Sequence, residues 1–95
     1  RAHLVISLSN GTVQRIDLAD AVISFGRGDD NTIVIDDDFT STHHARITPR
    51  ERGWIIEDLG STNGTWIERK RISSPTPLGP GLKVRIGRTE IAVVA

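Results

Sequence analysis

The sequence predicts an all-β fold of the sandwich or barrel kind, in a single domain. Its 95 residues suffice for one hydrophobic core, and the apolar 37% is mostly Val, Ile, Leu and Ala, with only 4% aromatic residues. Short runs of alternating or β-branched residues recur along the chain, separated by Gly, Pro, Asn and Asp. No helix of ordinary length is visible, so we expect packed layers of short strands.

The first two predicted strands form a hairpin. Apolar residues occur on each side of a turn, as Leu4, Ile6 and Leu8 and then as Val13, Ile16 and Leu18. Between them lies Asn10-Gly11, a pair that favours the tight type I′ turn of a β-hairpin. We therefore expect two antiparallel strands that share one apolar face.

Seven further runs are predicted to be strands, because each is rich in β-branched residues and bounded by turn-forming ones. They are Ala21–Phe25, Thr32–Ile35, Ala45–Thr48, Trp54–Glu57, Thr65–Ile67, Leu82–Ile86 and Thr89–Val94. The Pro-rich stretch Ser73–Gly81 has strands on both sides, which favours an internal loop over a domain linker. Trp54 and Trp66 lie among apolar neighbours and are predicted to pack on the core or on a sheet face.

Composition excludes several classes of function. Twelve basic residues balance twelve acidic ones, which argues against a domain that binds nucleic acid by neutralising many phosphates. The chain has no Cys, so it has no disulfide, thiolate zinc site or thiol nucleophile. It also lacks a membrane-spanning apolar run or signal peptide, so we expect a cytoplasmic domain without direct membrane contact, although a tether elsewhere in the parent protein stays open.

The first residue is Arg1 and the sequence contains no Met. These two features favour a fragment cut from a longer protein. We therefore expect residues 1–95 to be one domain of that protein.

Three predicted loops carry groups suited to an anion. They contain Gly26-Arg27, Ser41-Thr42-His43-His44 and Ser61-Thr62-Asn63-Gly64-Thr65. A phosphate monoester has nearly two negative charges and three acceptor oxygens, so it favours an arginine fork, hydroxyl donors and backbone amides. A charge-assisted hydrogen bond contributes roughly 1.5–3 kcal/mol, so several converging donors would discriminate strongly against an unphosphorylated partner.

These segments, in this order, resemble the forkhead-associated (FHA) domain. The resemblance includes Trp54–Ser61, which leads into Asn63-Gly64-Thr65, and it extends over essentially the whole chain to Val84–Gly87 and Ile91–Val94. It implies a sandwich of two twisted antiparallel sheets with Greek-key connections and with binding loops at one end. It also implies a binding module for phosphothreonine peptides in Ser/Thr kinase signalling, without catalytic residues, metal or cofactor.

The resemblance assigns roles to individual residues. Arg27 and Ser41 would contact the phosphate, Thr42 would lie beside it, Thr62 would help to hold it, and Asn63 would hydrogen-bond the backbone of the bound peptide. The partner would be a phosphothreonine-containing protein, such as a Ser/Thr kinase or its substrate. A small pocket for the γ-methyl group would favour threonine over serine.

Other residues would shape the site or contact the peptide beside the phosphothreonine. Gly26 and His44 would shape it, with His44 bracing the Ser41 loop, and Gly64 would permit a turn that requires positive φ. Candidates for contact with flanking peptide residues are Phe39, Lys70 and Arg71.

The chain departs from the family pattern at two positions. Thr42 stands where many members carry Arg, Lys or Asn, which lowers the positive potential beside the phosphate. Glu68-Arg69 replaces the Asn-Gly turn of the family.

Three rival interpretations use the same residues. Ser41, His44 and Asp58 could form a hydrolase triad, but Ser41 lacks the Gly-x-Ser-x-Gly context of a nucleophile elbow. Arg27-Gly28-Asp29 spells an adhesion tripeptide, although a three-residue match arises easily by chance. His43 and His44 beside Asp36–Asp38 suggest a metal site, but a solvated acidic loop is the simpler interpretation.

Overall fold

The computed structural model describes residues 2–95 and contains eleven β-strands. They are β1 (His3–Ser7), β2 (Val13–Asp17), β3 (Ile23–Gly26), β4 (Ile33–Val34), β5 (Ala45–Arg50), β6 (Gly53–Asp58), β7 (Thr65–Ile67), β8 (Lys70–Arg71), β9 (Thr76–Leu78), β10 (Lys83–Ile86) and β11 (Thr89–Val94). The described residues include no helix long and apolar enough to cross a membrane.

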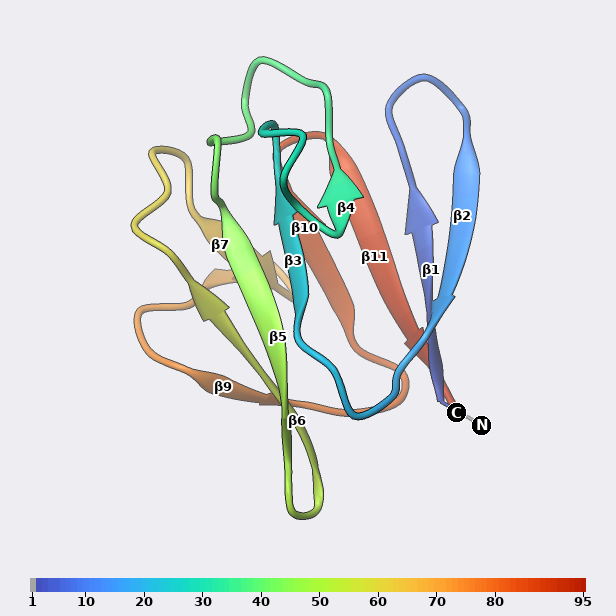
Figure 1. The fold of residues 1–95 in the computed structure, drawn as a ribbon. Helices are drawn as coiled ribbons and strands as arrows, with labels where there is room; N and C mark the ends of the chain where they lie inside the picture. Colours follow the sequence, from blue (N-terminus) through green and yellow to red (C-terminus); the bar gives the residue numbers. More distant parts are fainter. Residues whose placement is uncertain (1) are drawn as a thin grey trace.

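The strands form two sheets packed face to face (Figure 1). The six-stranded sheet has the order β2-β1-β11-β10-β7-β8, and the five-stranded sheet has the order β4-β3-β5-β6-β9. Since β1 pairs with both β2 and β11, the first and last strands are neighbours, with His3 opposite Val94 (Figure 1). The predicted β-sandwich is therefore confirmed.

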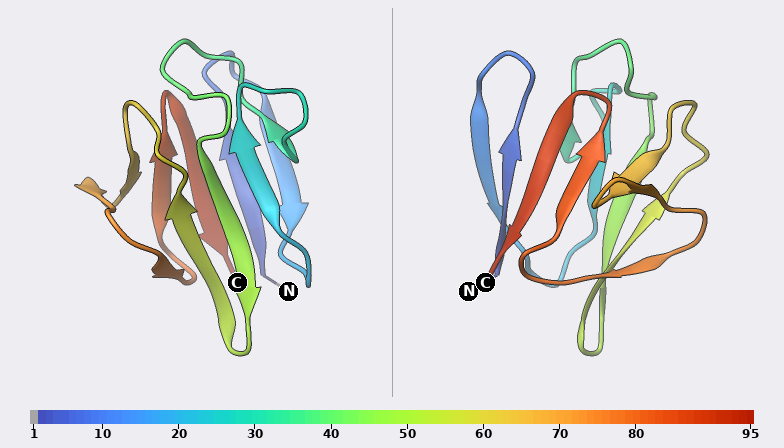
Figure 2. Two further views of the ribbon diagram at one scale, coloured as in Figure 1. Left: turned by 60° about the vertical axis from the view of Figure 1, so that its left-hand side comes forward. Right: turned by 180° about the vertical axis from the view of Figure 1, so that it is seen from behind.

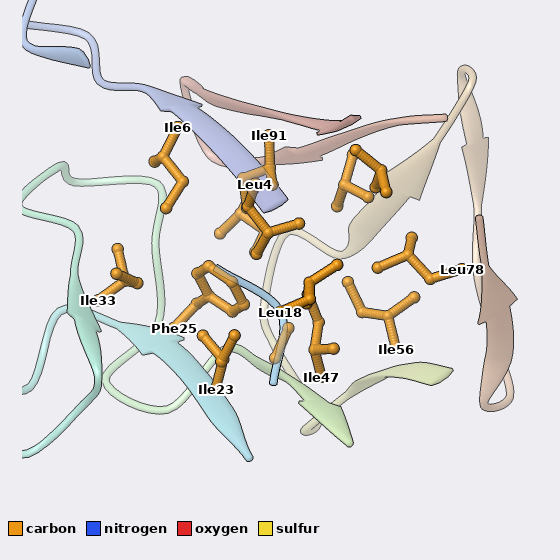
Figure 3. Close-up of a cluster of buried hydrophobic side chains, with 14 of the residues drawn as sticks. Leu4, Ile6, Leu18, Ile23, Phe25, Ile33, Ile47, Ile56, Leu78 and Ile91 are labelled. Carbon is orange, nitrogen blue, oxygen red and sulfur yellow. The ribbon is translucent and has the colours of Figure 1, made fainter. Parts of the chain in front are cut away.

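The core lies between the sheets and takes side chains from both of them (Figure 3). Leu4, Ile6 and Ile91 extend from the six-stranded sheet toward Phe25 and Ile47 of the five-stranded one, and all five are fully buried. Burial alternates along the strands, as in β10 and β11, because successive side chains point to opposite faces of a sheet. The predicted alternation of apolar and polar residues therefore places the apolar side chains of both sheets in this core.

The first hairpin differs from its prediction in detail. β1 and β2 are antiparallel, but five residues separate Ser7 from its partner Val13, so the loop is longer than a two-residue turn. Only Gly11 of the Asn10-Gly11 pair has positive φ, which excludes the type I′ geometry. Val13 is 63% exposed, because odd-numbered residues of β2 point outward. Its predicted place on the core face is wrong.

The type I′ pattern of two consecutive positive φ values occurs at Glu68-Arg69, in the turn from β7 to β8. Their φ angles are 47° and 70°. Glu68 also binds β10, since its backbone N–H donates to the Lys83 carbonyl and its Oε1 accepts from the Lys83 N–H at 3.1 Å. Glu68-Arg69 therefore forms this turn without the Asn-Gly pair that the family carries here.

Three short strands explain the remaining differences. β8 and β9 were not predicted, and β9 lies inside the stretch predicted to be a loop. Pro77 is compatible with a strand there because β9 is an edge strand that pairs only with β6. β4 pairs with β3 in parallel, so the five-stranded sheet is not wholly antiparallel. Between β3 and β4 the chain reverses direction through a turn in which the Asn31 N–H donates to the Gly28 carbonyl.

Candidate functional site

Three loops meet at one end of the sandwich. They follow β3, β4 and β6, and Figure 2 shows all three at the end opposite the β5–β6 hairpin. A hollow of about 440 Å³ opens there. It is lined by Arg27, Ser41, Thr42, Thr62 and Asn63, together with Asp38, Phe39 and Thr40. The structure thus brings together all five residues predicted to bind the ligand.

The β3–β4 and β4–β5 loops are joined through their backbones. The Arg27 N–H donates to the Ser41 carbonyl at 2.9 Å, and the Gly28 N–H donates to the Thr42 carbonyl at 3.1 Å. A Cβ on Gly26 would lie 2.1 Å from the Thr42 carbonyl oxygen, which leaves no room for a side chain. Gly26 therefore shapes the site by allowing the two loops to approach closely.

Asn31 strengthens this junction and was not singled out from the sequence. Its Nδ2 donates to the carbonyls of Gly28 and Thr42 at 2.7 and 2.8 Å. The side chain is almost completely buried, at 8% exposure for the residue. Its position three residues after Gly28 is the available sequence signal, since Asn favours such turns.

His44 connects the Ser41 loop to the turn after β6. It is fully buried, its Nδ1 accepts from the Ser41 N–H at 3.1 Å, and its Nε2 donates to the Gly64 carbonyl at 2.8 Å. Because Nδ1 accepts and Nε2 donates, the ring is neutral with its proton on Nε2. One imidazole therefore holds two of the three loops in fixed relation.

The Ser41 hydroxyl is oriented by the third loop. Its oxygen accepts from the Thr62 N–H at 3.1 Å, which leaves the hydroxyl proton available to a ligand. Asn63 Nδ2 donates to the Phe39 carbonyl at 3.0 Å, and the Asn63 carbonyl accepts from Trp66 Nε1 at 3.0 Å. The second Nδ2 hydrogen and the Oδ1 of Asn63 remain available for a peptide backbone.

Beneath Thr62 and Asn63, one carboxylate organises the turn from β6 to β7. Asp58 accepts from the backbone N–H of Ser61 at 2.9 Å and from the hydroxyls of Ser61 and Thr65. Burial raises the pKa of Asp58, but these hydrogen bonds outweigh it and hold the pKa below its ordinary value. The Ser61 hydroxyl also accepts from the Gly64 N–H, and Gly64 has the predicted positive φ, at 88°.

The Ser41 loop is also attached to the opposite sheet, at the β10–β11 turn. Asp37 accepts from the N–H groups of Phe39 and Arg88 at 2.7 and 3.2 Å. A Cβ on Gly87 would lie 2.5 Å from Thr40 Oγ1, and the Arg88 guanidinium lies over the Phe39 ring, 4.7 Å from its centroid. Asp37 is buried at 8% exposure, so the prediction of a fully solvated acidic loop is wrong at this residue.

Arg27 supplies the positive charge in the hollow. Its side chain is 46% exposed, and its Nη2 lies 4.0 Å from Oδ1 of Asp38, which is 94% exposed. An exposed pair at this distance contributes little to stability. The guanidinium is therefore accessible to an anionic ligand, although Asp38 would compete weakly for it.

The structure does not assemble the rival sites. Both ring nitrogens of His44 are bound to backbone groups of Ser41 and Gly64, and Asp58 binds Ser61 and Thr65, so no Ser-His-Asp relay forms. The adhesion tripeptide is not a free protruding loop, because the N–H groups of its first two residues are bound to the Ser41 loop.

The metal site considered as a rival interpretation is also not formed. His43 pairs with Asp30 at 2.8 Å instead of with Asp36–Asp38, and this contact holds the pKa of Asp30 below its ordinary value. Within residues 2–95, no three His, Asp or Glu side chains are grouped as metal ligands.

Comparison with known proteins agrees with this geometry. The FHA domain family model matches residues 23–87, which include all three loops. FhaB, an FHA domain-containing protein of Mycolicibacterium smegmatis, is 47% identical over 77 residues, covering 81% of this chain and 50% of FhaB. The chain thus spans about half the length of this relative.

Solved structures share the fold. Mycobacterium tuberculosis EmbR in complex with a low affinity phosphopeptide has a TM-score of 0.83 and 32% identity, over 98% of this chain and 24% of EmbR. An FHA domain structure from work on phosphothreonine-dependent FHA domain interactions has a TM-score of 0.84 and 27% identity, over 98% of this chain and 96% of that one. The chain belongs to the FHA domain family.

Proposed function

We propose that this domain binds a phosphothreonine-containing segment of a protein partner and thereby couples Ser/Thr kinase activity to the assembly of a complex. The observation that carries the proposal is the 440 Å³ hollow, which collects a guanidinium, several hydroxyls and a carboxamide from three loops. These are the donors that a phosphate and an extended peptide backbone require. The phosphopeptide bound by EmbR supports the same chemistry in a relative.

The proposed division of roles follows from the hydrogen bonds that remain unfilled. Arg27 supplies positive charge and a fork of donors, and Ser41 supplies a hydroxyl proton already oriented by Thr62. Thr42 and Thr62 flank them, and Asn63 binds the peptide backbone. A pocket that buries the threonine γ-methyl would favour phosphothreonine over phosphoserine by about 0.8 kcal/mol, or roughly fourfold.

We further propose that the domain binds without catalysis. The side chains that a hydrolase mechanism would use are engaged in positioning the loops, as His44 is with Ser41 and Gly64. Phosphate enters this scheme as part of the partner and leaves unchanged. A screen with ester and phosphoester substrates should give no turnover, and turnover that is lost in Ser41→Ala would contradict the proposal.

The test is calorimetry with paired peptides that differ only in phosphorylation of one threonine. Arg27→Ala should weaken binding of the phosphopeptide about 10- to 150-fold, the equivalent of one charge-assisted interaction of roughly 1.5–3 kcal/mol. Arg52→Ala is a matched control, because Arg52 is exposed in the β5–β6 turn at the opposite end of the sandwich. Equal binding of phosphorylated and unphosphorylated peptides by the unsubstituted domain would refute the proposal.

A further inference from the structure

A second hollow lies on the outer face of the six-stranded sheet, the face seen in the right-hand view of Figure 2. Its volume is about 580 Å³, and its lining includes Trp66, Glu68, Arg69, Lys83, Arg85 and Glu90. It shares no lining residue with the hollow around Arg27. It is therefore a separate surface feature.

The cations of this hollow have no carboxylate partners. Arg69, Lys83 and Arg85 line it; Arg71, opposite Trp66 on the neighbouring strand, lies outside the lining, with its side chain beside Gly64. The ion pairs found among residues 2–95 involve none of these four side chains. Since the whole chain is neutral, this is a local excess of positive charge.

Glu68 and Glu90 offset two of the three cations that line the hollow, so its lining keeps a net charge of +1. Glu68 is bound to the backbone N–H of Lys83, and Glu90 is cross-strand from Arg85 but is not among the ion pairs found in residues 2–95. At the centre, Trp66 lies between Arg71 and Arg85 in the ladder. A half-buried aromatic surface beside Arg69, Lys83 and Arg85 suits a segment that carries acidic side chains.

Trp66 also links this hollow to the site around Arg27. Its indole N–H donates to the carbonyl of Asn63, whose side chain lines the other hollow. Asn63 and Trp66 are three residues apart, a span of at most about 10 Å of extended chain. A partner bound by its phosphothreonine would therefore need only a short continuation to reach Trp66.

We propose that this outer hollow binds an acidic segment of the same partner that carries the phosphothreonine. The proposal rests on the proposed function and adds a second point of contact with a stated chemistry. Linkage makes the second contact intramolecular, so a weak electrostatic interaction gains from a high effective concentration. The same contact is sensitive to salt because the cations are exposed.

The experiment compares two phosphothreonine peptides that end in a flexible Gly-Ser linker followed by five Glu or five Gln residues. Each is made with the tail at either end. Of the two tail positions, the one that gives the tighter complex is compared. At low salt, the Glu-tailed peptide should bind the unsubstituted domain about five- to tenfold more tightly than the Gln-tailed peptide with its tail at the same end. Lys83→Gln/Arg85→Gln should abolish this gain and leave binding of the Gln-tailed peptide unchanged.

Arg50→Gln/Arg52→Gln is the matched control, because it removes the same charge from the exposed β5–β6 turn. It should retain the full gain. No gain in the parent, or an equal loss in both double variants, would overturn the proposal. So would tighter binding of a DNA oligonucleotide of equal charge that depends on Lys83 and Arg85, since the hollow would then be a nucleic-acid site.

A second measurement separates this proposal from the proposed function. The Glu-tailed peptide without phosphate, added at millimolar concentration, should shift the indole N–H resonance of Trp66 and leave that of Trp54 in place. This shift is expected whether or not the phosphopeptide binds at Arg27. An unchanged Trp66 resonance would contradict binding of the acidic segment and would leave the proposed phosphothreonine binding unaffected.

Discussion

Replacing His44 with Phe retains a ring of similar size between the Ser41 loop and the Gly64 turn but removes two hydrogen bonds. His44 is fully buried, so the Ser41 N–H and the Gly64 carbonyl lose their partners in a region that excludes water. Each unsatisfied buried group costs about 1–3 kcal/mol, so His44→Phe should lower the free energy of unfolding by about 2–6 kcal/mol. A domain of this size has about 5–15 kcal/mol in total.

Urea unfolding followed by the fluorescence of Trp54 and Trp66 measures this loss. With a slope of roughly 1–3 kcal/mol per M, a loss of about 3 kcal/mol lowers the midpoint by about 1–3 M. His43→Phe is the control: it makes the same substitution at the neighbouring exposed residue and should change stability by about 0.5 kcal/mol or less. If His44→Phe unfolded within about 0.3 M of the parent, the two hydrogen bonds would not hold the loops as argued.

Three further predictions concern Arg69 in the β7–β8 turn and the carboxylates of Asp38 and Asp58. Arg69→Gly should raise the free energy of unfolding by about 1 kcal/mol in urea titrations, because Arg69 has a φ of 70° that glycine adopts without strain. Asp38→Asn should tighten phosphopeptide binding about two- to fivefold by calorimetry, less at high salt, because it removes an exposed charge beside Arg27. The pKa of Asp58 is lowered in the folded state, so its stabilisation is present above the ordinary value of 3.8 and is lost as pH falls through the folded pKa. Asp58→Asn should flatten the dependence of thermal unfolding on pH below that value.

The sequence predicted the long strands well because their signal is local. The six-residue β11 has the predicted bounds Thr89–Val94, and the six-residue β5 begins at the predicted Ala45. β8 and β9 have two and three residues and depend on partners elsewhere in the chain. Their pairing with β7 and β6 comes from tertiary context, which a local pattern does not contain.

The candidate site divides in the same way. The residues predicted to touch the ligand were identified by their type and order in the loops. The contact from Asp37 to Arg88 crosses 51 residues and exists only because the two sheets pack face to face. Nothing near either residue in the sequence indicates that contact. The contacts of Asn31 with Gly28 and of Ser61 with Gly64, in contrast, lie within short turns, where Asn and Ser are expected to bind the backbone.

The exposed and the buried parts of the site do different work. Arg27, Thr62 and Asn63 are exposed and therefore accessible to a ligand, whereas His44 is buried and its ring binds the backbone of Ser41 and Gly64. Loops that are held in place before binding lose less conformational entropy when the ligand binds, which raises affinity without new contacts. Substitution of Arg27 should therefore change binding alone, whereas substitution of His44 should change stability and binding together. Measuring both quantities for both variants distinguishes a pre-formed site from one that the peptide assembles.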